Sequence, residues 1–134
     1  MRTCRSYFPS LALAIVAFGV MGLASAYGAS LFVVDGAVAE PDGTPVSGLT
    51  VAVQNLSKPA LSTYESEPTG VDGSYGVTMV RDFLTSVSDI GDELLIQAVD
   101  TSGAVDVVRG QVVHTITALE ESQQFGATVD ITLS

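Results

Sequence analysis

Asp89, Asp92 and Glu93 are the candidate metal ligands of this chain. Calcium takes about six to eight oxygen ligands, and carboxylates that converge from loops supply many of them. The three acids flank Gly91, a turn-forming residue, so we expect them to lie in a loop. The segment lacks the D-x-[DN]-x-[DN]-G pattern of a calcium-binding loop. Turn formation is therefore the first interpretation of these acids, and a calcium site is the alternative.

Other residues with chemical potential are few, because the chain has one histidine and no tryptophan. His114 is predicted to be a partly buried histidine at a strand edge, since catalysis would need a positioned nucleophile and acid and zinc would need more His or Cys ligands. Tyr64 lies between polar neighbours and is the candidate ring for stacking on a small ligand or glycan, whereas Tyr75 is expected to pack internally. No catalytic residue is predicted, and the chain is not expected to be an enzyme.

The charge of the chain restricts its partners. Fifteen Asp and Glu face five Lys and Arg, which gives a formal net charge of −10. Such an acidic surface repels phosphate backbones and anionic lipid, so no nucleic-acid partner is expected. Most of the acids are scattered along the chain in predicted turns, where we expect them to keep an exported protein soluble.

The first 26 residues predict export. Arg2 and Arg5 begin the chain, an unbroken apolar run follows over Leu11–Leu23, and Ala24–Ala26 forms a small-x-small cleavage site. This order of basic, apolar and small residues is typical of a secretory signal peptide. We therefore predict a signal peptide over residues 1–26 and a secreted, periplasmic or cell-surface location. Contact with the membrane is expected only through this segment, if it stays uncleaved.

The remaining residues, 27–134, are the length of one domain. Cys4, the only cysteine, lies within the predicted signal peptide, so the processed domain must fold without disulfides. No cofactor is expected, apart from the possible calcium ion.

Turn residues divide this domain into short segments that alternate apolar and polar side chains. Period-two alternation in segments rich in Val, Thr and Ile is typical of half-buried antiparallel strands. The pattern predicts a single antiparallel β-sandwich of about seven strands. The predicted strands cover residues 32–39, 49–55, 61–65, 74–80, 93–99, 105–113 and 127–133.

Three features depart from simple strand patterning. The alternation slips after Arg109, so Gly110 is expected to mark a bulge or bend. Residues 117–124 predict one or two helical turns, with Thr117 as the cap and Glu120 at the capping-box position. Residues 81–89 lack the period of a strand and are expected to form a loop or a helical turn.

The turn motifs resemble those of carboxypeptidase regulatory-like domains. Gly36–Val38 and Pro41–Val51 match the G-x-V strand, D-G-x-P turn and second strand that open such domains. Thr69–Val77 matches their D-G-x-Y turn, and Gly91–Val99 matches the strand entry that follows. The likeness covers about residues 34–103 and implies a prealbumin-like (transthyretin-like) or immunoglobulin-like sandwich without catalytic residues.

These observations lead to two alternative functions. The first is an exported, non-enzymatic module that acts by protein–protein contact, adhesion or self-association, with residues 127–133 as an edge strand or strand donor. The second is a small-ligand or glycan-binding module that uses Tyr64 or a calcium site at the loops. A hydrolase accessory domain is a third, which would need a catalytic domain encoded beside it.

Overall fold

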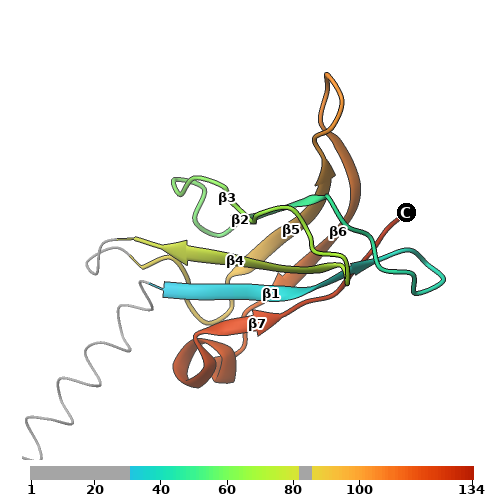
Figure 1. The fold of residues 1–134 in the computed structure, drawn as a ribbon. Coiled ribbons are helices and arrows are strands. Elements are labelled where there is room, and N and C mark those ends of the chain that lie inside the picture. Colours follow the sequence, from blue (N-terminus) through green and yellow to red (C-terminus); the bar gives the residue numbers. More distant parts are fainter. Residues whose placement is uncertain (1–30, 82–85) are drawn as a thin grey trace, which may run out of the picture.

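The computed structural model describes residues 31–81 and 86–134, so the predicted signal peptide and part of the 81–89 connection lie outside the described residues. Within them the chain forms eight strands and one short helical segment (Figure 1). The strands are β1 (Leu31–Ala39), β2 (Thr50–Asn55), β3 (Tyr64–Glu65), β4 (Ser74–Val80), β5 (Glu93–Asp100), β6 (Val107–Thr115), β7 (Gly126–Thr128) and β8 (Ile131–Thr132), and the helical segment is η1 (Glu120–Gln124). None of the described helical residues form a segment long and apolar enough to cross a membrane.

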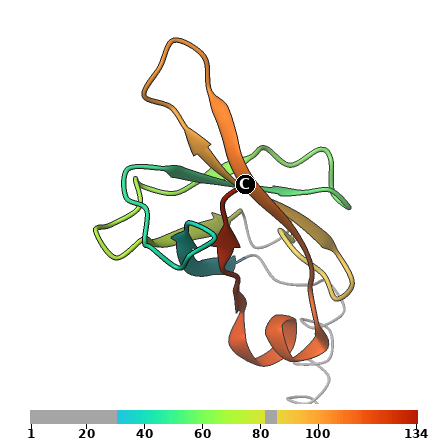
Figure 2. The ribbon, with the colours of Figure 1, turned by 90° about the vertical axis from the view of Figure 1, so that its right-hand side faces the viewer.

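The strands form two sheets that pack face to face, which confirms the predicted all-β sandwich (Figures 1 and 2). One sheet has the order β4-β1-β7, with β8 also paired to β1, and the other has the order β3-β2-β5-β6. The pairs within the second sheet and the β1–β4 pair are antiparallel. Most predicted strands agree with the structure to within two residues at each end.

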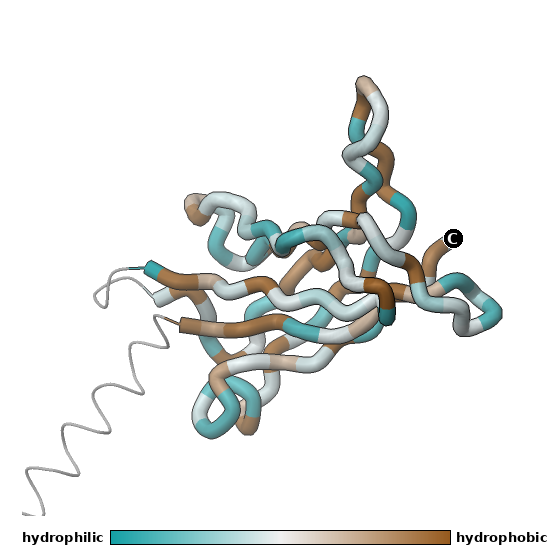
Figure 3. Tube along the Cα trace, in the orientation of Figure 1, coloured by the Kyte–Doolittle hydropathy of each residue, from teal (hydrophilic) through white to brown (hydrophobic). Residues whose placement is uncertain are grey.

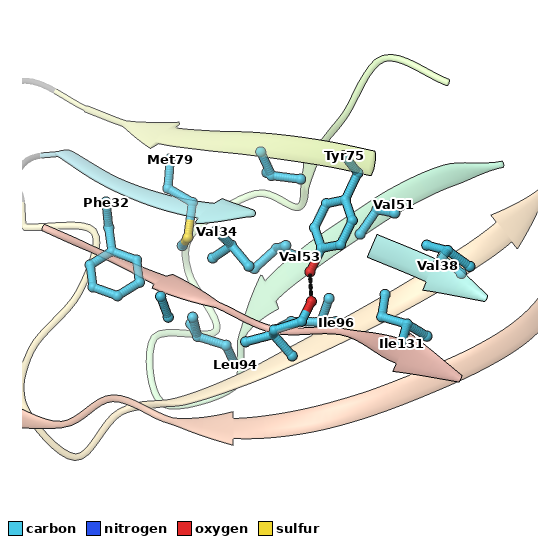
Figure 4. Close-up of a cluster of buried hydrophobic side chains, with 14 of the residues drawn as sticks. Phe32, Val34, Val38, Val51, Val53, Tyr75, Met79, Leu94, Ile96 and Ile131 are labelled. Carbon is cyan, nitrogen blue, oxygen red and sulfur yellow. Dashed lines mark hydrogen bonds between the residues drawn. The ribbon is translucent and has the colours of Figure 1, made fainter. Parts of the chain in front are cut away.

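Alternation along each strand builds the core. In β4 every second residue is buried, and β2 alternates buried with half-buried positions, as expected when one face of a sheet packs inward. Figure 4 shows inward side chains of both sheets meeting, and Phe32, Met79 and Leu94 among them are fully buried. Tyr75 lies in the same layer and donates its hydroxyl to the Val129 carbonyl, so its predicted packing role is confirmed.

The C-terminal strand differs from its prediction. The segment predicted as one strand over 127–133 is two short strands, β7 and β8, and both run parallel to β1. The interruption lies at Val129, whose carbonyl oxygen would be 2.0 Å from a Cβ atom on Gly36. Gly36 has a φ of 156°, a conformation that glycine adopts readily. Beside the interruption, Asp130 accepts a hydrogen bond from the Ala37 N–H at 3.0 Å, in place of the backbone ladder.

The β5–β6 hairpin carries the predicted irregularity. The pairing shifts by one residue at Arg109, which has no partner on β5, so the bulge lies one residue before the predicted Gly110. A Cβ atom on Gly110 would lie 2.9 Å from the Thr132 carbonyl oxygen, because β8 passes close to β6 there. The Ser134 N–H donates to the Arg109 carbonyl at 2.9 Å. Beyond the bulge the hairpin extends away from the two sheets (Figure 1, orange).

The third strand is shorter than predicted. Residues 61–65 were expected to form a strand, but only Tyr64 and Glu65 pair with β2. The preceding residues turn instead, since the Leu61 N–H donates to the Lys58 carbonyl at 3.0 Å. The edge of the second sheet at β3 is therefore only two residues long.

Candidate functional site

The structure brings Asp89 and Asp92 together and places a lysine beside both. The Nζ atom of Lys58 contacts the Asp89 carboxylate directly and lies 3.7 Å from Asp92 Oδ2. Glu93 begins β5 and is exposed, and its N–H donates to the Ser57 hydroxyl at 3.1 Å. In the described part of the chain, no group of three His, Cys, Asp or Glu residues could hold a metal ion. The Lys58 ammonium group thus supplies positive charge where a cation was hypothesised.

A buried asparagine completes this arrangement. Asn55, 1% exposed at the end of β2, donates through Nδ2 to the Val87 carbonyl and to Asp92 Oδ2, both at 2.9 Å. The Asp89 N–H donates to the same Asp92 oxygen at 3.0 Å. The hydrogen bond to Asp89 raises the pKa of Lys58 above its ordinary value, although partial burial opposes the shift. We call Asn55, Lys58, Asp89 and Asp92 the loop cluster.

Tyr64 is half-buried, in contrast to the exposed ring that its polar neighbours predicted. Its side chain packs against the hydrophobic core. Its hydroxyl points toward the Val80 carbonyl of β4 at 3.4 Å, which is long for a hydrogen bond. The ring therefore helps close the gap between β3 and β4, at the place where the two sheets meet.

His114 has the predicted partly buried position at a strand edge and forms a local interaction. Its Nε2 atom lies 2.9 Å from Glu120 Oε1. Glu120 also forms the predicted capping box, in which its carboxylate accepts from the Thr117 N–H at 2.9 Å and its own N–H donates to the Thr117 hydroxyl at 3.2 Å. Burial opposes ionisation of Glu120, but the hydrogen bonds from Thr117 and His114 together hold its pKa below the usual value.

A second buried polar pair was missed by sequence reasoning. Ser88 is fully buried and donates its hydroxyl to Glu121, with distances of 2.8 and 3.1 Å to the two carboxylate oxygens. The pair connects the segment before β5 to η1. Neither residue lies in a recognisable motif, because one serine and one glutamate 33 positions apart carry no sequence signal.

An open hollow lies beside β1 and β7. It is lined by both polar and apolar groups, and Thr128 donates its hydroxyl to Asp35 within it at 2.8 Å. The hollow contains no aromatic ring among its lining residues. Its lining residues are Val33, Asp35, Gln124, Gly126, Ala127 and Thr128.

Of the edge strands that the structure describes, β6 is the longest. It is the outermost strand of the second sheet, and no described strand is paired beyond it. Its nine residues, VVRGQVVHT, contain no Asp, Glu or Lys and one Arg, Arg109, which forms an ion pair with Glu40 at 3.6 Å. Val107, Val108 and Val113 are each about half exposed.

The direction of the backbone groups along β6 follows from its pairing. Ile116, just beyond the strand, donates to the Asp92 carbonyl at 2.9 Å, so its N–H faces the β5 side. In an antiparallel ladder alternate residues face the neighbouring strand, which places the N–H and C=O groups of Val112 and His114 toward β5 as well. The groups of Gln111, Val113 and Thr115 therefore point outward. We call Gln111–Thr115 the β6 edge.

The outer face of the second sheet is almost free of charge. Its side chains are those that alternate with the buried ones on β2, β5 and β6, and Figure 3 shows that hydrophilic residues concentrate in the connections. Among the described strand residues that alternate toward this face, Glu65 and Glu93 bring charge to its margins. The other outward residues are Thr50, Ala52, Gln54, Leu95, Gln97, Val99, Val108, Gln111, Val113 and Thr115.

Comparison with known proteins gives no family assignment. No protein-family model matches the chain, and no curated protein matches it in sequence. Among solved structures, it is similar to the dioxygenase domain of a dioxygenase and carbohydrate-binding protein fusion from the cellulolytic bacterium Streptomyces sp. SirexAA-E, with a TM-score of 0.48, 13% identity, and coverage of 82% of this chain and 83% of that chain. A 9R-lipoxygenase from Cyanothece gives a TM-score of 0.45 and 11% identity. That likeness covers 78% of this chain but spans only 16% of the lipoxygenase.

Proposed function

We propose that this chain is an exported, non-enzymatic β-sandwich module that binds protein by adding a partner strand to the β6 edge. The observation that carries the proposal is that β6 has no described strand beyond it, so that its pairing with β5 directs the backbone groups of Gln111, Val113 and Thr115 outward on a stretch without Asp, Glu, Lys or Arg. An extended peptide can satisfy such groups by continuing the sheet. Side chains between the hydrogen-bonded positions would then set specificity.

The other sheet edges support this choice by contrast. β3 is two residues long, and β7 and β8 are three and two residues long. The side of β4 away from β1 lies beside β3, where Tyr64 reaches toward Val80. Short or covered edges are the usual protection against unwanted pairing, as are Lys and Pro on the edge itself. β6 has neither lysine nor proline along its nine residues, and its bulge and its one arginine, both at Arg109, lie outside the stretch Gln111–Thr115.

The C-terminal segment does not suit the role of strand donor. Ala127, Val129, Ile131 and Leu133 all lie in the hydrophobic core. Releasing the segment to a partner would expose these four side chains and remove the acceptor of the Tyr75 hydroxyl. The proposal therefore uses β6 as an acceptor edge in place of residues 127–133 as a donor.

The location follows from the N-terminal sequence, and the proposed site of action is outside the cytoplasm. The basic start, the apolar run and the cleavage motif of residues 1–26 support export. The net charge of −10 supports a protein partner over nucleic acid. Cofactor chemistry has no role in the proposed function.

The proposal can be tested with a phage-displayed peptide library as the probe. The full sequence is expressed in an exporting host, immobilised, and panned against the library. Binders selected on the native chain should lose binding to Val113→Pro, which removes an outward N–H and obstructs an added strand. They should keep binding to Val113→Thr, which preserves the N–H and the β-branched shape. Binders that do not distinguish these two variants would contradict the proposal.

A glycan array with and without calcium tests the alternative of ligand binding. We expect no glycan to bind in either condition, because Tyr64 is half-buried and Lys58 lies between the candidate calcium ligands. Binding that disappears in Tyr64→Ala, or that requires calcium, would replace strand addition as the leading function.

A further inference from the structure

We propose that the strand added to the β6 edge comes from a second copy of this chain, paired antiparallel about a two-fold axis at Val113. This inference rests on the proposed function, because it names the occupant of the same edge. The part of β6 whose outward backbone groups have no described partner is limited at both ends. At one end the Ser134 N–H donates to the Arg109 carbonyl, and at the other the chain turns into η1. Val113 is the midpoint of Gln111–Thr115. Two antiparallel copies therefore overlap along the whole free stretch only when Val113 lies opposite its counterpart.

The side chains are compatible with themselves in this register. Val113 would pair with Val113 of the second copy, and Gln111 would lie opposite Thr115 on both sides of the axis. Apolar β-branched pairs and hydrogen-bonding polar pairs are both favourable across neighbouring strands. A two-fold interface must be self-complementary in this way, since the same patch is used twice.

The charge distribution favours a second copy over a basic partner. A basic protein would be attracted to the loops, where most of the acids lie, and not to an uncharged edge. A partner with the same net charge of −10 can approach closely only where acids are absent. The outer face beside the β6 edge meets that condition along most of its length, because Glu65 and Glu93 lie at its margins. The nearby Glu120 carboxylate is already bonded to Thr117 and His114.

The resulting arrangement would join the second sheets of two copies into one continuous sheet. Leu95 pairs with Val113 across β5 and β6, so the apolar positions of the two outer faces would continue across the axis. Every outward N–H and C=O group of Gln111, Val113 and Thr115 would gain a partner. Because this ladder is short, we expect the association to be reversible and dependent on concentration.

Sedimentation equilibrium of the chain, expressed from its full sequence in an exporting host, tests the association. The apparent mass should rise toward twice the monomer value with concentration, and more strongly at high salt, since salt screens the repulsion between two acidic copies. Val113→Pro should remain monomeric, and Val113→Thr should associate like the native chain. A native chain that stays monomeric up to millimolar concentration in high salt would overturn the inference.

Disulfide trapping tests the register and does not depend on the proline variant folding. In a Cys4→Ser background, Val113→Cys places the only thiol on the axis, where it can bond to its counterpart. Val108→Cys is the matched control, because Val108 is 48% exposed against 51% for Val113 but lies beyond the bulge. Copper-catalysed oxidation should link Val113→Cys roughly tenfold or more faster than Val108→Cys, owing to the higher effective concentration of the paired thiols. Equal rates would contradict the two-fold pairing.

The two proposals can fail separately. A monomeric chain whose peptide binders still lose binding to Val113→Pro would keep the edge as a binding site and assign it to a different protein. Loss of both results would reject the edge itself.

Discussion

The loop cluster and the β6 edge use polar groups in opposite ways. The side chains of the loop cluster form ion pairs and hydrogen bonds with one another. These interactions connect the end of β2 to the segment before β5. The β6 edge contains no Asp, Glu, Lys or Arg, and its outward backbone groups face no described strand.

Side chains whose chemical type suits ligand binding are not necessarily available to bind a ligand. Within the described residues, no buried side-chain nitrogen or oxygen lacks a hydrogen-bond partner. The internal side chains therefore have little unused bonding capacity to offer a ligand. We infer that the unpaired hydrogen-bonding groups are the backbone N–H and C=O groups of an edge strand. The residue types of that strand give almost no indication of them.

The largest expected effect concerns the C-terminal segment, which pairs with β1. If the sandwich did not need this segment, its release would leave β1 as a second edge able to accept a strand. Deleting residues 126–134 removes four buried apolar side chains. Burial of each of the three larger ones, Val129, Ile131 and Leu133, contributes about 1.5–3 kcal/mol. That loss approaches the whole stability of a small domain, about 5–15 kcal/mol. We expect the truncated chain to show no cooperative thermal transition by near-ultraviolet circular dichroism. Removing Ser134 alone is the control and should leave a cooperative transition.

A cooperative transition after the larger deletion would mean that β7 and β8 are not needed by the sandwich. In that case the segment could be exchanged with a partner, and β1 would compete with β6 as the binding edge.

The next effect tests whether the loop cluster is structural. Asp92→Ala removes one of the two acceptors of the buried Asn55 amide and the side-chain acceptor of the Asp89 N–H, which should lower the free energy of unfolding by about 2–3 kcal/mol. Asp89→Ala removes a side chain that is 41% exposed, so we expect a loss below about 1 kcal/mol. Urea denaturation of the two variants measures the difference.

The effect of calcium on thermal stability is a second test of whether the loop cluster is structural. If Lys58 permanently supplies the positive charge in the loop cluster, calcium should not change the melting temperature of the native chain relative to EDTA. A calcium-dependent rise that Asp89→Ala abolishes would return the cluster to the list of binding sites and weaken the contrast with the β6 edge.

Two adjacent prolines test the direction of the β6 backbone groups. Val112→Pro removes an N–H that we place in the ladder with β5, whereas Val113→Pro removes one that we place outside it. Both changes impose the same φ restriction. Because Val112 also packs against the hydrophobic core, each proline variant is compared with the alanine variant at the same position. On that basis we expect Val112→Pro to cost about 2 kcal/mol more in the free energy of unfolding, measured in urea, because it leaves a carbonyl of β5 unpaired. Equal costs would show that the outward assignment is wrong, and with it the proposed edge.

Much of the fold follows from local patterning. The strands β2 and β4 alternate along their whole length, and β5 alternates as far as Val99. The capping box from Thr117 to Glu120 is a short-range motif, so these strands and the capping box could be predicted. The split of β7 from β8 could not, because it depends on the close approach of Val129 to Gly36, 93 positions earlier in the chain.

The candidate sites were less predictable than the fold for the same reason. Asp89 and Asp92 were recognised as a local group, but their contact with Lys58 and Asn55 forms only when β2 pairs with β5. The β6 edge depends on strand order, which alternation does not encode. A sequence can therefore suggest which residues carry charge without indicating which backbone remains accessible.

The smallest expected effect concerns His114, which lies within the β6 edge but contacts Glu120 through its side chain. If His114 and Glu120 only stabilise the entry to η1, Glu120→Gln should lower the free energy of unfolding by about 1 kcal/mol or less at pH 6. The folded-state pKa of Glu120 is lowered, so its carboxylate contributes stability above the unfolded pKa and loses that contribution as the pH falls through the folded pKa. The native and variant curves, measured in urea from pH 6 downward, should converge in acid. The variant should associate and bind selected peptides like the native chain; a change in binding would extend the β6 edge to its inward-facing residues.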